Sequence, residues 1–459
     1  MKNTTILTAF TLVYFILLFF VAIFVNRIPD KLILLALFIP ALLSLLFLDL
    51  TITIIGILLL QIGIQFFFDQ HMIISNFTLS LPLLFGLTLL NKEKTLQINN
   101  SSVIYIILLN FLCLIFSTLI ANNPIHSMYL LINYFQAFLV FLFFVWFLDS
   151  VKSLKTILKL YILGSLIPVL IGLLQIISVL DVEEMNRIQG TFMSSNEFAP
   201  FLAFNFLLFI SLGLYERKIL FKIGLFVLAI INIFIFFHTY SRGAIIGLTG
   251  AIIAYIFLIK KSQSIRKVIL IVIFILIIVF SGLTIGMSKY FVRFTEIGEG
   301  DFDFSTIERV GVWEAALKLF KSSPLVGVGV NNFQEEYPQF FPTYGIRLIS
   351  DKLYHAHNLL LNTLAEQGII GFIVLFITIL YIIKMLISIN KNSSSKYEAV
   401  LSPFLSGYFV YFLLHNIFDC VWTAYYHVAL QMQLALFFAL TVFIFKNLTI
   451  KDKTCSHFV

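Results

Sequence analysis

The sequence predicts an all-α, polytopic integral membrane protein. Of its 459 residues, 60% are hydrophobic and only 12% are charged, whereas soluble globular domains are about one-quarter charged. Its apolar runs reach the length of about 20 residues that a helix needs to cross the hydrocarbon core. They are too long and too unbroken for the strands of an outer-membrane barrel, which have about ten alternating residues. The composition also excludes a disordered chain and a disulfide scaffold.

Apolar stretches bounded by polar residues predict about twelve to fourteen transmembrane helices. The first, from Thr5 to Val25, follows Lys2 and has no small-residue cleavage site, so we interpret it as a span rather than a signal peptide. The segments 31–48, 50–68 and 73–90 could instead be half-helices or re-entrant pieces. The candidate spans are 5–25, 31–48, 50–68, 73–90, 102–121, 128–148, 155–180, 197–214, 219–237, 243–259, 267–286, 369–389, 400–418 and 428–446.

The predicted organisation has four parts: N-terminal helices in 1–180, further helices in 181–286, a long loop in 287–356, and C-terminal helices with a short cytoplasmic tail in 357–459. If the N-terminus is cytoplasmic, 19 of the 30 lysines and arginines lie in inside segments and four lie in short outside loops. The remaining seven lie in the long loop, which the positive-inside rule does not count. This asymmetry predicts that the long loop is extracytoplasmic, and it accounts for the net positive charge without nucleic-acid binding.

Two of the four outer-loop arginines have contexts that suggest a function. Arg242 stands where one predicted span ends and the next begins, and a cation at a helix N-terminus opposes the helix dipole. An anion such as a phosphate, shared between the guanidinium and the first-turn N–H groups, would make this arrangement favourable. The alternative is an arginine that reaches lipid headgroups. Arg187 could serve a similar role, or it could simply pair with an acidic residue of its own loop, Asp181, Glu183 or Glu184.

A second candidate cluster, Tyr354-His355-Ala356-His357-Asn358, closes the long loop. Residues i and i+2 lie about 200° apart on a helix, so His355 and His357 cannot face one point if this stretch is helical. We therefore expect one imidazole to act as a general base toward a hydroxyl and the other to be a surface or supporting residue. The alternative is a histidine at headgroup level. No third ligand stands at a usual metal-site spacing, so we expect no metal.

Other motifs carry little weight. Asp301 and Asp303 spell the DxD motif of metal-dependent glycosyltransferases, but their loop is predicted to lie outside, where nucleotide sugars are not supplied. The sequence has no phosphate-binding loop and no GxSxG nucleophile motif. Gly243 and Gly247 form a GxxxG spacing that would permit close helix packing.

Residues from about 187 to 390 resemble the O-antigen ligase and O-antigen polymerase superfamily of bacterial envelope-polysaccharide enzymes. The order and spacing of several short motifs carry this resemblance. They are Arg187-x-x-Gly190 with Ser195-Asn196-Glu197, Tyr240-Ser241-Arg242-Gly243, Glu308-Arg309 with Trp313-Glu314, Ser323-Pro324 to Gly329, and His355-Ala356-His357-Asn358 running to Glu366-Gln367-Gly368.

The resemblance implies a multi-pass cell-membrane glycosyltransferase that uses neither a metal nor a cofactor. Its donor would be a glycan on a polyprenyl-diphosphate carrier, and its acceptor would be a hydroxyl of a glycan, lipid or protein. Arg187 and Arg242 would contact the donor diphosphate, and His357 would activate the acceptor, with His355 as the alternative base. Arg309, Tyr240 and Asn358 would contact substrate.

Two alternatives remain open. A polymerase and a ligase differ only in the acceptor, and the sequence does not separate them. A non-enzymatic flippase or polysaccharide transporter would carry ionisable residues in the middle of its spans and broken, repeated helices. The predicted spans here are filled with Leu, Ile and Phe, which favours an enzyme.

Overall fold

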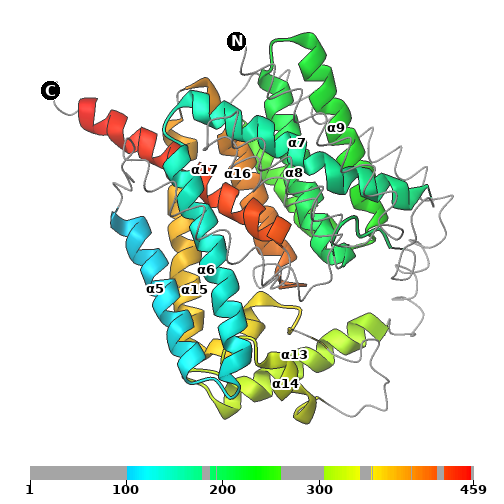
Figure 1. The fold of residues 1–459 in the computed structure, drawn as a ribbon, viewed down its shortest axis with the longest axis vertical. Coiled ribbons are helices and arrows are strands. Elements are labelled where there is room, and N and C mark those ends of the chain that lie inside the picture. The colour runs from blue at the N-terminus through cyan, green and yellow to red at the C-terminus, as the bar shows by residue number, and fades with distance from the viewer. Residues whose placement is uncertain are drawn as a thin grey trace, which may run out of the picture. The chain divides into compact units, whose positions relative to one another are not determined.

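The computed structural model describes residues 101–177, 187–192, 194–259, 304–341, 353, 355–393, 395–420 and 428–455, and these residues form helices without any strand. Six helices, α6, α7, α8, α9, α15 and α16, are long and apolar enough to cross a membrane, which confirms the predicted all-α polytopic class (Figure 1). The predicted spans before residue 101 and at 267–286 lie outside the described residues. The helices are α5 (Ser101–Leu119), α6 (Pro124–Phe147), α7 (Val151–Ile176), α8 (Ser195–Tyr215), α9 (Ile219–His238), α10 (Arg242–Leu258), α13 (Phe304–Ser322), α14 (Phe333–Glu336), a 3₁₀ turn η3 (Tyr337–Gln339), α15 (Leu359–Asn392), α16 (Lys396–His415) and α17 (Val428–Cys455).

Several helices begin earlier than hydropathy predicts, because polar capping residues set their ends. Helix α7 begins after Ser150, which forms a capping box with Ser153. Helix α15 begins at Leu359 rather than at residue 369, since the side chain of Asn358 accepts hydrogen bonds from the first-turn N–H groups. The extra ten residues of α15 carry polar side chains that a hydropathy window rejects.

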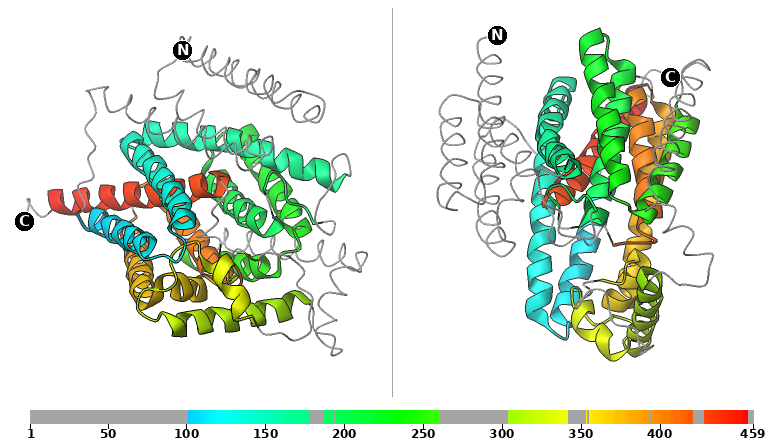
Figure 2. Two further views of the ribbon diagram at one scale, coloured as in Figure 1. Left: turned by 60° about the horizontal axis from the view of Figure 1, so that its bottom comes forward. Right: turned by 90° about the vertical axis from the view of Figure 1, so that its right-hand side faces the viewer.

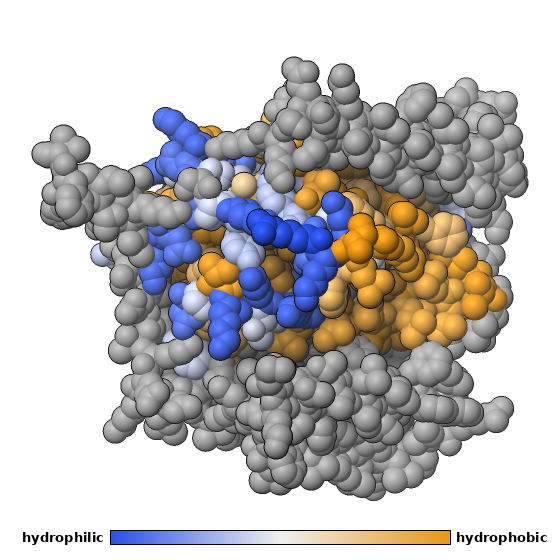
Figure 3. Space-filling view, turned by 90° about the horizontal axis from the view of Figure 1, so that it is seen from above, coloured by the Kyte–Doolittle hydropathy of each residue, from blue (hydrophilic) through white to orange (hydrophobic). Residues whose placement is uncertain are grey.

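The surface of these helices suits a lipid environment. On the face shown in Figure 3, hydrophobic residues form a broad continuous area beside a hydrophilic one. Large hydrophobic side chains such as Leu220 on α9, Phe257 on α10 and Ile387 on α15 are exposed, which would be unfavourable in water. We therefore interpret this area as lipid-facing.

The chain divides into two compact units. One comprises Met1–Gln97, Asn133–Phe201 and Tyr426–Phe443, and the other comprises Ile98–Ile132, Leu202–Tyr425 and Ile444–Val459. In the first unit, the buried amide of Gln433 on α17 donates to the hydroxyl of Tyr161 on α7 at 2.6 Å. The same amide donates to the backbone oxygen of Phe201 at 3.2 Å. These two acceptors for the NH₂ group offset part of the cost of burying Gln433, whose side-chain oxygen has no hydrogen-bond partner among the described residues.

In the second unit, α10 and α16 pack closely through glycines. A Cβ atom added to Gly243 would lie 2.9 Å from the Cβ atom of Phe418, and one added to Gly247 would lie 3.0 Å from the backbone oxygen of Tyr411. The predicted role of the Gly243-x-x-x-Gly247 spacing is thus confirmed. This packing brings the start of α10 next to the end of α16.

The described part of the long loop has its own core. Helix α13 and the short α14 pack against the beginning of α15 (Figures 1 and 2). Their shared hydrophobic cluster comprises Val312, Ala315, Ala316, Leu319, Val328, Phe333, Tyr337, Leu353, Ala356 and Ala365. The loop segment is therefore a folded, helical layer rather than an extended connection.

A break in α15 receives the segment that follows α13. Gly368 has a φ of +61° inside the helix, and Gly327 has a φ of +69° in the facing segment. A Cβ atom on Gly368 would lie 2.4 Å from the backbone of Leu325, and one on Gly327 would lie 2.3 Å from the backbone of Glu366. Both positions require glycine, because the two backbones touch and both φ values are positive.

Candidate active site

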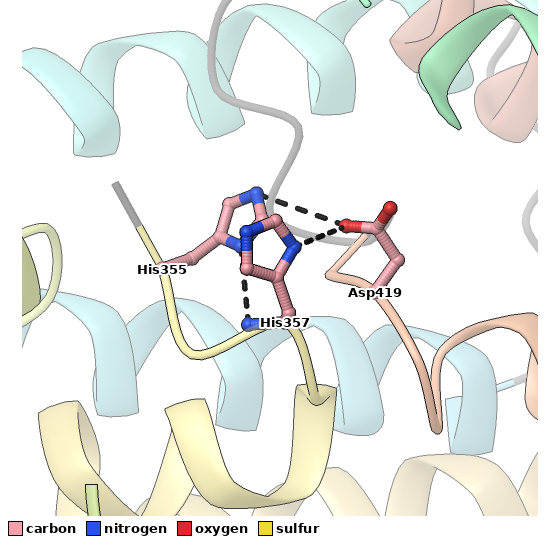
Figure 4. Close-up of side chains that lie close together, drawn as sticks. All are labelled: His355, His357 and Asp419. Atoms are coloured by element: carbon pink, nitrogen blue, oxygen red, sulfur yellow. Dashed lines mark hydrogen bonds and ion pairs between the residues drawn. The ribbon is translucent and has the colours of Figure 1, made fainter. Parts of the chain in front are cut away.

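The two histidines of the His355-Ala356-His357 segment point to the same side of the chain. This segment precedes α15 and is not helical, so residues two apart share a face. Ala356 lies between them and is fully buried in the core of the loop. The ring centroids of His355 and His357 are 4.4 Å apart, and the rings are nearly perpendicular (Figure 4). The geometry that would have separated them applies only to a helix, and both imidazoles belong to one site.

A carboxylate completes this site. Asp419 follows α16 and is buried, and its Oδ1 atom lies 3.5 Å from the Nδ1 atom of His357. The same oxygen lies 3.8 Å from the Nε2 atom of His355 (Figure 4). The three side chains come from the two ends of the interval 355–419, which contains α15 and α16, so only the fold brings them together.

His355 is held as a neutral supporting group. Burial, the charge of His357 and, more weakly, the charge of Arg309 lower the pKa of His355 to about 4, although Asp419 opposes this shift. Its Nδ1 atom accepts a hydrogen bond from the backbone N–H of His357 at 3.3 Å. The proton of the neutral ring is therefore on Nε2, the atom that faces Asp419.

Asp419 remains ionised in this setting. Burial opposes its ionisation, but the contact with His357 and the charges of the surrounding histidines outweigh burial and hold the pKa of the carboxyl well below its usual range. A carboxylate beside the Nδ1 atom of His357 fixes the orientation of the imidazole and stabilises it when it gains a proton. The Nε2 atom of His357 is then the atom that can accept a proton.

His357 adopts an unusual backbone conformation, with a φ of +47°. A non-glycine residue in the left-handed region costs about 1–2 kcal/mol, and such residues are frequent at functional sites. On its C-terminal side, Asn358 caps α15 and also donates from Nδ2 to the backbone oxygen of Ile417 at 3.0 Å. Asn358 thus ties the histidine segment to the segment that carries Asp419, while its predicted substrate contact remains a prediction.

Arg242, Tyr240 and Arg309 lie in the same unit as the histidines. Arg242 is the first residue of α10, and its neighbour Gly243 lies against Phe418, the residue before Asp419. Tyr240, just before α10, has a φ of +51°. Arg309 on α13 is close enough for its charge to act on His355. The fold therefore gathers two of the predicted arginines around the His357–Asp419 pair.

Arg187 belongs to the other unit, where a buried amide organises its loop. Its Nη2 atom donates to Oδ1 of Asn196 at 2.9 Å. The side-chain oxygen of Gln175 on α7 accepts from the backbone N–H groups of Gln189 at 3.2 Å and Gly190 at 2.8 Å. The acidic residues of its own loop considered as alternative partners lie outside the described residues.

His355, His357 and Asp419 also have the ligand types of a metal site. Among the described residues, His355, His357 and Asp419 offer three potential ligand atoms within 4.8 Å of one another. Two imidazoles and a carboxylate are a donor set that a divalent transition metal accepts. However, Nδ1 of His355 accepts a backbone hydrogen bond, so the proton of the neutral ring lies on Nε2, the nitrogen that would have to bind the metal. This arrangement fits a histidine–carboxylate pair better than a metal site. The DxD residues Asp301 and Asp303 lie outside the described part of the chain.

Comparison with known proteins connects this geometry to a family. Residues 225–376 match the family model described as O-Antigen ligase. The predicted resemblance to the O-antigen ligase and polymerase superfamily is confirmed. The matched O-antigen ligase segment contains Arg242, Arg309, His355 and His357, whereas Arg187 precedes it and Asp419 follows it. No curated protein matches the chain.

Asp419 was not predicted as a site residue. Its signal in the sequence is weak: it is a single acidic residue directly after the predicted span 400–418. The predicted topology does place this position on the same side as the long loop, which could have marked it. Its pairing with His357 arises because α15 and α16 run in opposite directions along the chain and bring Asp419 back to the histidine segment, which is a property of the fold.

Proposed function

We propose that this protein is a membrane glycosyltransferase that moves a glycan from a polyprenyl-diphosphate carrier to a hydroxyl of an acceptor, in the synthesis of a surface polysaccharide. The observation that supports it best is the His357–Asp419 pair beside the N-terminus of α10, where Arg242 begins the helix. Transfer of a glycan from a diphosphate requires a base for the acceptor hydroxyl and a positively charged group beside the leaving diphosphate, close to each other.

In the proposed reaction, the acceptor oxygen attacks the anomeric carbon of the donor glycan. The hydroxyl proton passes to Nε2 of His357, and Asp419 stabilises the resulting imidazolium. The bond between the anomeric carbon and the phosphate oxygen breaks, and its electron pair leaves with the carrier diphosphate. Arg242, assisted by the N–H groups at the start of α10, stabilises this negative charge.

The other predicted residues take supporting roles in this proposal. Arg187 would contact the donor diphosphate, as its motif implies, while Arg309 and Tyr240 would contact the glycan or the carrier. His355 is neutral at pH 7 and would help to orient His357. The reaction proposed for these residues uses no metal and no cofactor.

A reconstituted transfer assay tests this function. Purified protein in liposomes would be given a polyprenyl-diphosphate glycan and candidate acceptors, and the product would be measured for wild type, Arg242→Ala and His357→Ala. We expect both variants to lose transfer, with Lys318→Ala, on the exposed side of α13, as the matched control. Wild-type transfer by both site variants would refute the assignment.

The product distinguishes the remaining alternatives. Longer chains on the carrier would indicate a polymerase, and glycan moved to a different acceptor would indicate a ligase. Movement of the donor across the bilayer without a new glycosidic bond would indicate a transporter instead.

The proposed orientation places the N-terminus in the cytoplasm and the active site outside it, at the cell membrane. It can be tested with a cysteine in place of Lys321, an exposed residue of the long loop, and one in place of Lys218, which is exposed between α8 and α9. A membrane-impermeant maleimide should label intact cells only at position 321. Labelling only at position 218 would invert the orientation.

A further inference from the structure

A chain of hydrogen bonds inside the loop core leads from α15 to the histidine segment. The Oδ1 atom of Asn362 accepts a hydrogen bond from the backbone N–H of Ala356 at 3.0 Å. The Nδ2 atom of Asn362 donates to Oε2 of Glu366 at 3.0 Å. Ala356 lies between His355 and His357, so the chain ends at the backbone that carries both imidazoles.

The burial of these groups is unusual. Asn362 and Glu366 are each only 1% exposed, and Ala356 is fully buried. Burying a carboxyl group is costly unless it is hydrogen-bonded, and core positions on α15 would otherwise favour apolar side chains. A buried amide and carboxyl, four residues apart and linked to each other, indicate a specific task at this place.

The carboxyl group of Glu366 also binds the long loop at the start of α14. Its Oε1 atom accepts from the backbone N–H of Phe333, at the start of α14, at 3.3 Å. The backbone oxygen of Glu366 accepts from the N–H of Gly329 at 2.9 Å. Glu366 therefore joins the segment that follows α13, and with it the layer that contains Arg309, to the segment that presents His357.

The left-handed backbone at His357 needs support, and the hydrogen bonds through Asn362 supply part of it. Such a conformation persists only where its surroundings hold it on both sides. On the C-terminal side, Asn358 caps α15, and the N–H of Leu359 donates to the oxygen of Asn416 at 2.9 Å. On the N-terminal side, the hydrogen bond from the N–H of Ala356 to Asn362 fixes the backbone in the same way. Loss of either would let the imidazole turn away from Asp419.

We propose that Asn362 and Glu366 are positioning residues for proton transfer by His357, acting through the backbone of Ala356. This inference rests on the proposed function, because it assumes that His357 is the base. Neither residue touches the reactants. Glu366 orients the amide of Asn362, Asn362 fixes the N–H of Ala356, and the fixed backbone keeps the Nδ1 atom of His357 toward Asp419.

The most informative variant is Glu366→Gln, which keeps the shape of the side chain but presents an NH₂ group to one of two hydrogen-bond donors. We expect kcat to fall about 10- to 100-fold, as for other residues that orient a reacting group, while KM for the lipid-linked donor changes less than about twofold. Asn362→Ala, which removes the link to Ala356, should give the same split if Glu366→Gln folds poorly.

Asn390→Ala is the matched control. Asn390 is a partly buried asparagine on the same helix, and its amide donates to Ser406 at 2.6 Å, at the end of α15 remote from His357. It should leave kcat near the wild-type value. Melting temperatures of all variants in detergent would show that each is folded.

A double-mutant comparison separates positioning from a structural role. In the His357→Ala background, Glu366→Gln should leave the residual transfer rate unchanged, because its effect passes through the absent imidazole. If it lowers the residual rate as much as it lowers the wild-type rate, the positioning role is wrong.

The same data distinguish the two proposals. Absence of transfer by the wild-type protein would reject the proposed function. Wild-type transfer by His357→Ala would reject only His357 as the base, and the positioning role would fail with it. Loss of transfer in His357→Ala together with wild-type kcat in Glu366→Gln and Asn362→Ala would overturn only the positioning role.

Discussion

The loop of Arg187 and the segment of His357 each contain a residue in the left-handed conformation, and the two regions stabilise it differently. In both, a buried polar side chain on a neighbouring helix binds the backbone beside a functional residue, Gln175 in one case and Asn362 in the other. In the Arg187 loop the left-handed position is a glycine, Gly190, whereas in the other segment it is His357 itself. A glycine adopts this conformation without strain, so one amide is enough. A histidine does not, and its segment has a second, buried carboxyl behind the amide.

The largest effect should follow removal of the imidazole. His357→Ala should lower transfer about 10²- to 10⁴-fold, the range that general acid–base catalysis contributes, without a large loss of stability. The initial rate of product formation in the reconstituted assay measures this. His355→Ala provides the comparison, and a larger loss there would make His355 the base.

Removal of the carboxylate should have the next largest effect. Asp419→Asn keeps the size of the side chain but removes the charge that stabilises protonated His357, so kcat should fall about 10- to 100-fold. Single-turnover rates would show whether the chemical step is affected. An unchanged rate would show that the contact at 3.5 Å has no role in proton transfer.

Substitutions that disturb the Arg187 loop should mainly affect stability and donor binding. Gln175→Leu removes the acceptor of two backbone N–H groups and leaves them buried, which should cost about 1–3 kcal/mol. Chemical denaturation in detergent measures the stability, and the transfer assay should show a raised KM for the donor. A raised KM without lost stability would place the loop directly at the substrate.

Replacing the glycine at the left-handed position should sharpen the contrast. In Gly190→Ala, the new Cβ atom would lie 2.6 Å from the ring of Phe198 at a φ of +61°, so the melting temperature should fall. The backbone conformation alone costs about 1–2 kcal/mol. Gly224→Ala, at a helical position with nothing within 4 Å, is the control and should not be destabilised.

The smallest effect should be the dependence of stability on pH. The pKa of His355 is about 4 in the folded protein, below the value near 6.5 of an unperturbed histidine. The unfolded chain therefore binds more protons between these values, and stability should fall as the pH drops from about 6.5 toward 4. Because the side chain is 20% exposed, we expect a change of about 1 kcal/mol. His355→Gln should remove the part of the pH dependence that is due to His355. If the variant shows the same pH dependence as wild type, another group causes it.

Much of the architecture could be predicted because it depends on local composition. Helix positions from α5 to α10 follow from apolar length. Two glycines four residues apart predict that a helix can pack closely against α10, and the structure shows that this helix is α16. The start of α15 could not be predicted in this way. Its first turns carry Asn362 and Glu366, which hydropathy treats as loop residues although the fold buries them.

The sequence by itself determined the membrane class, the candidate arginines and the two histidines, because charge is so scarce in this chain that each polar motif stands out. The tertiary structure decided three things: that both imidazoles face one carboxylate, that this carboxylate is Asp419, and that the buried pair of Asn362 and Glu366 supports the segment between them. The contacts of the imidazoles with Asp419 are long-range contacts across α15 and α16, whereas Asn362 lies six residues from Ala356 and four from Glu366. The orientation of His357 also depends on its left-handed backbone, a feature that residue types alone do not show.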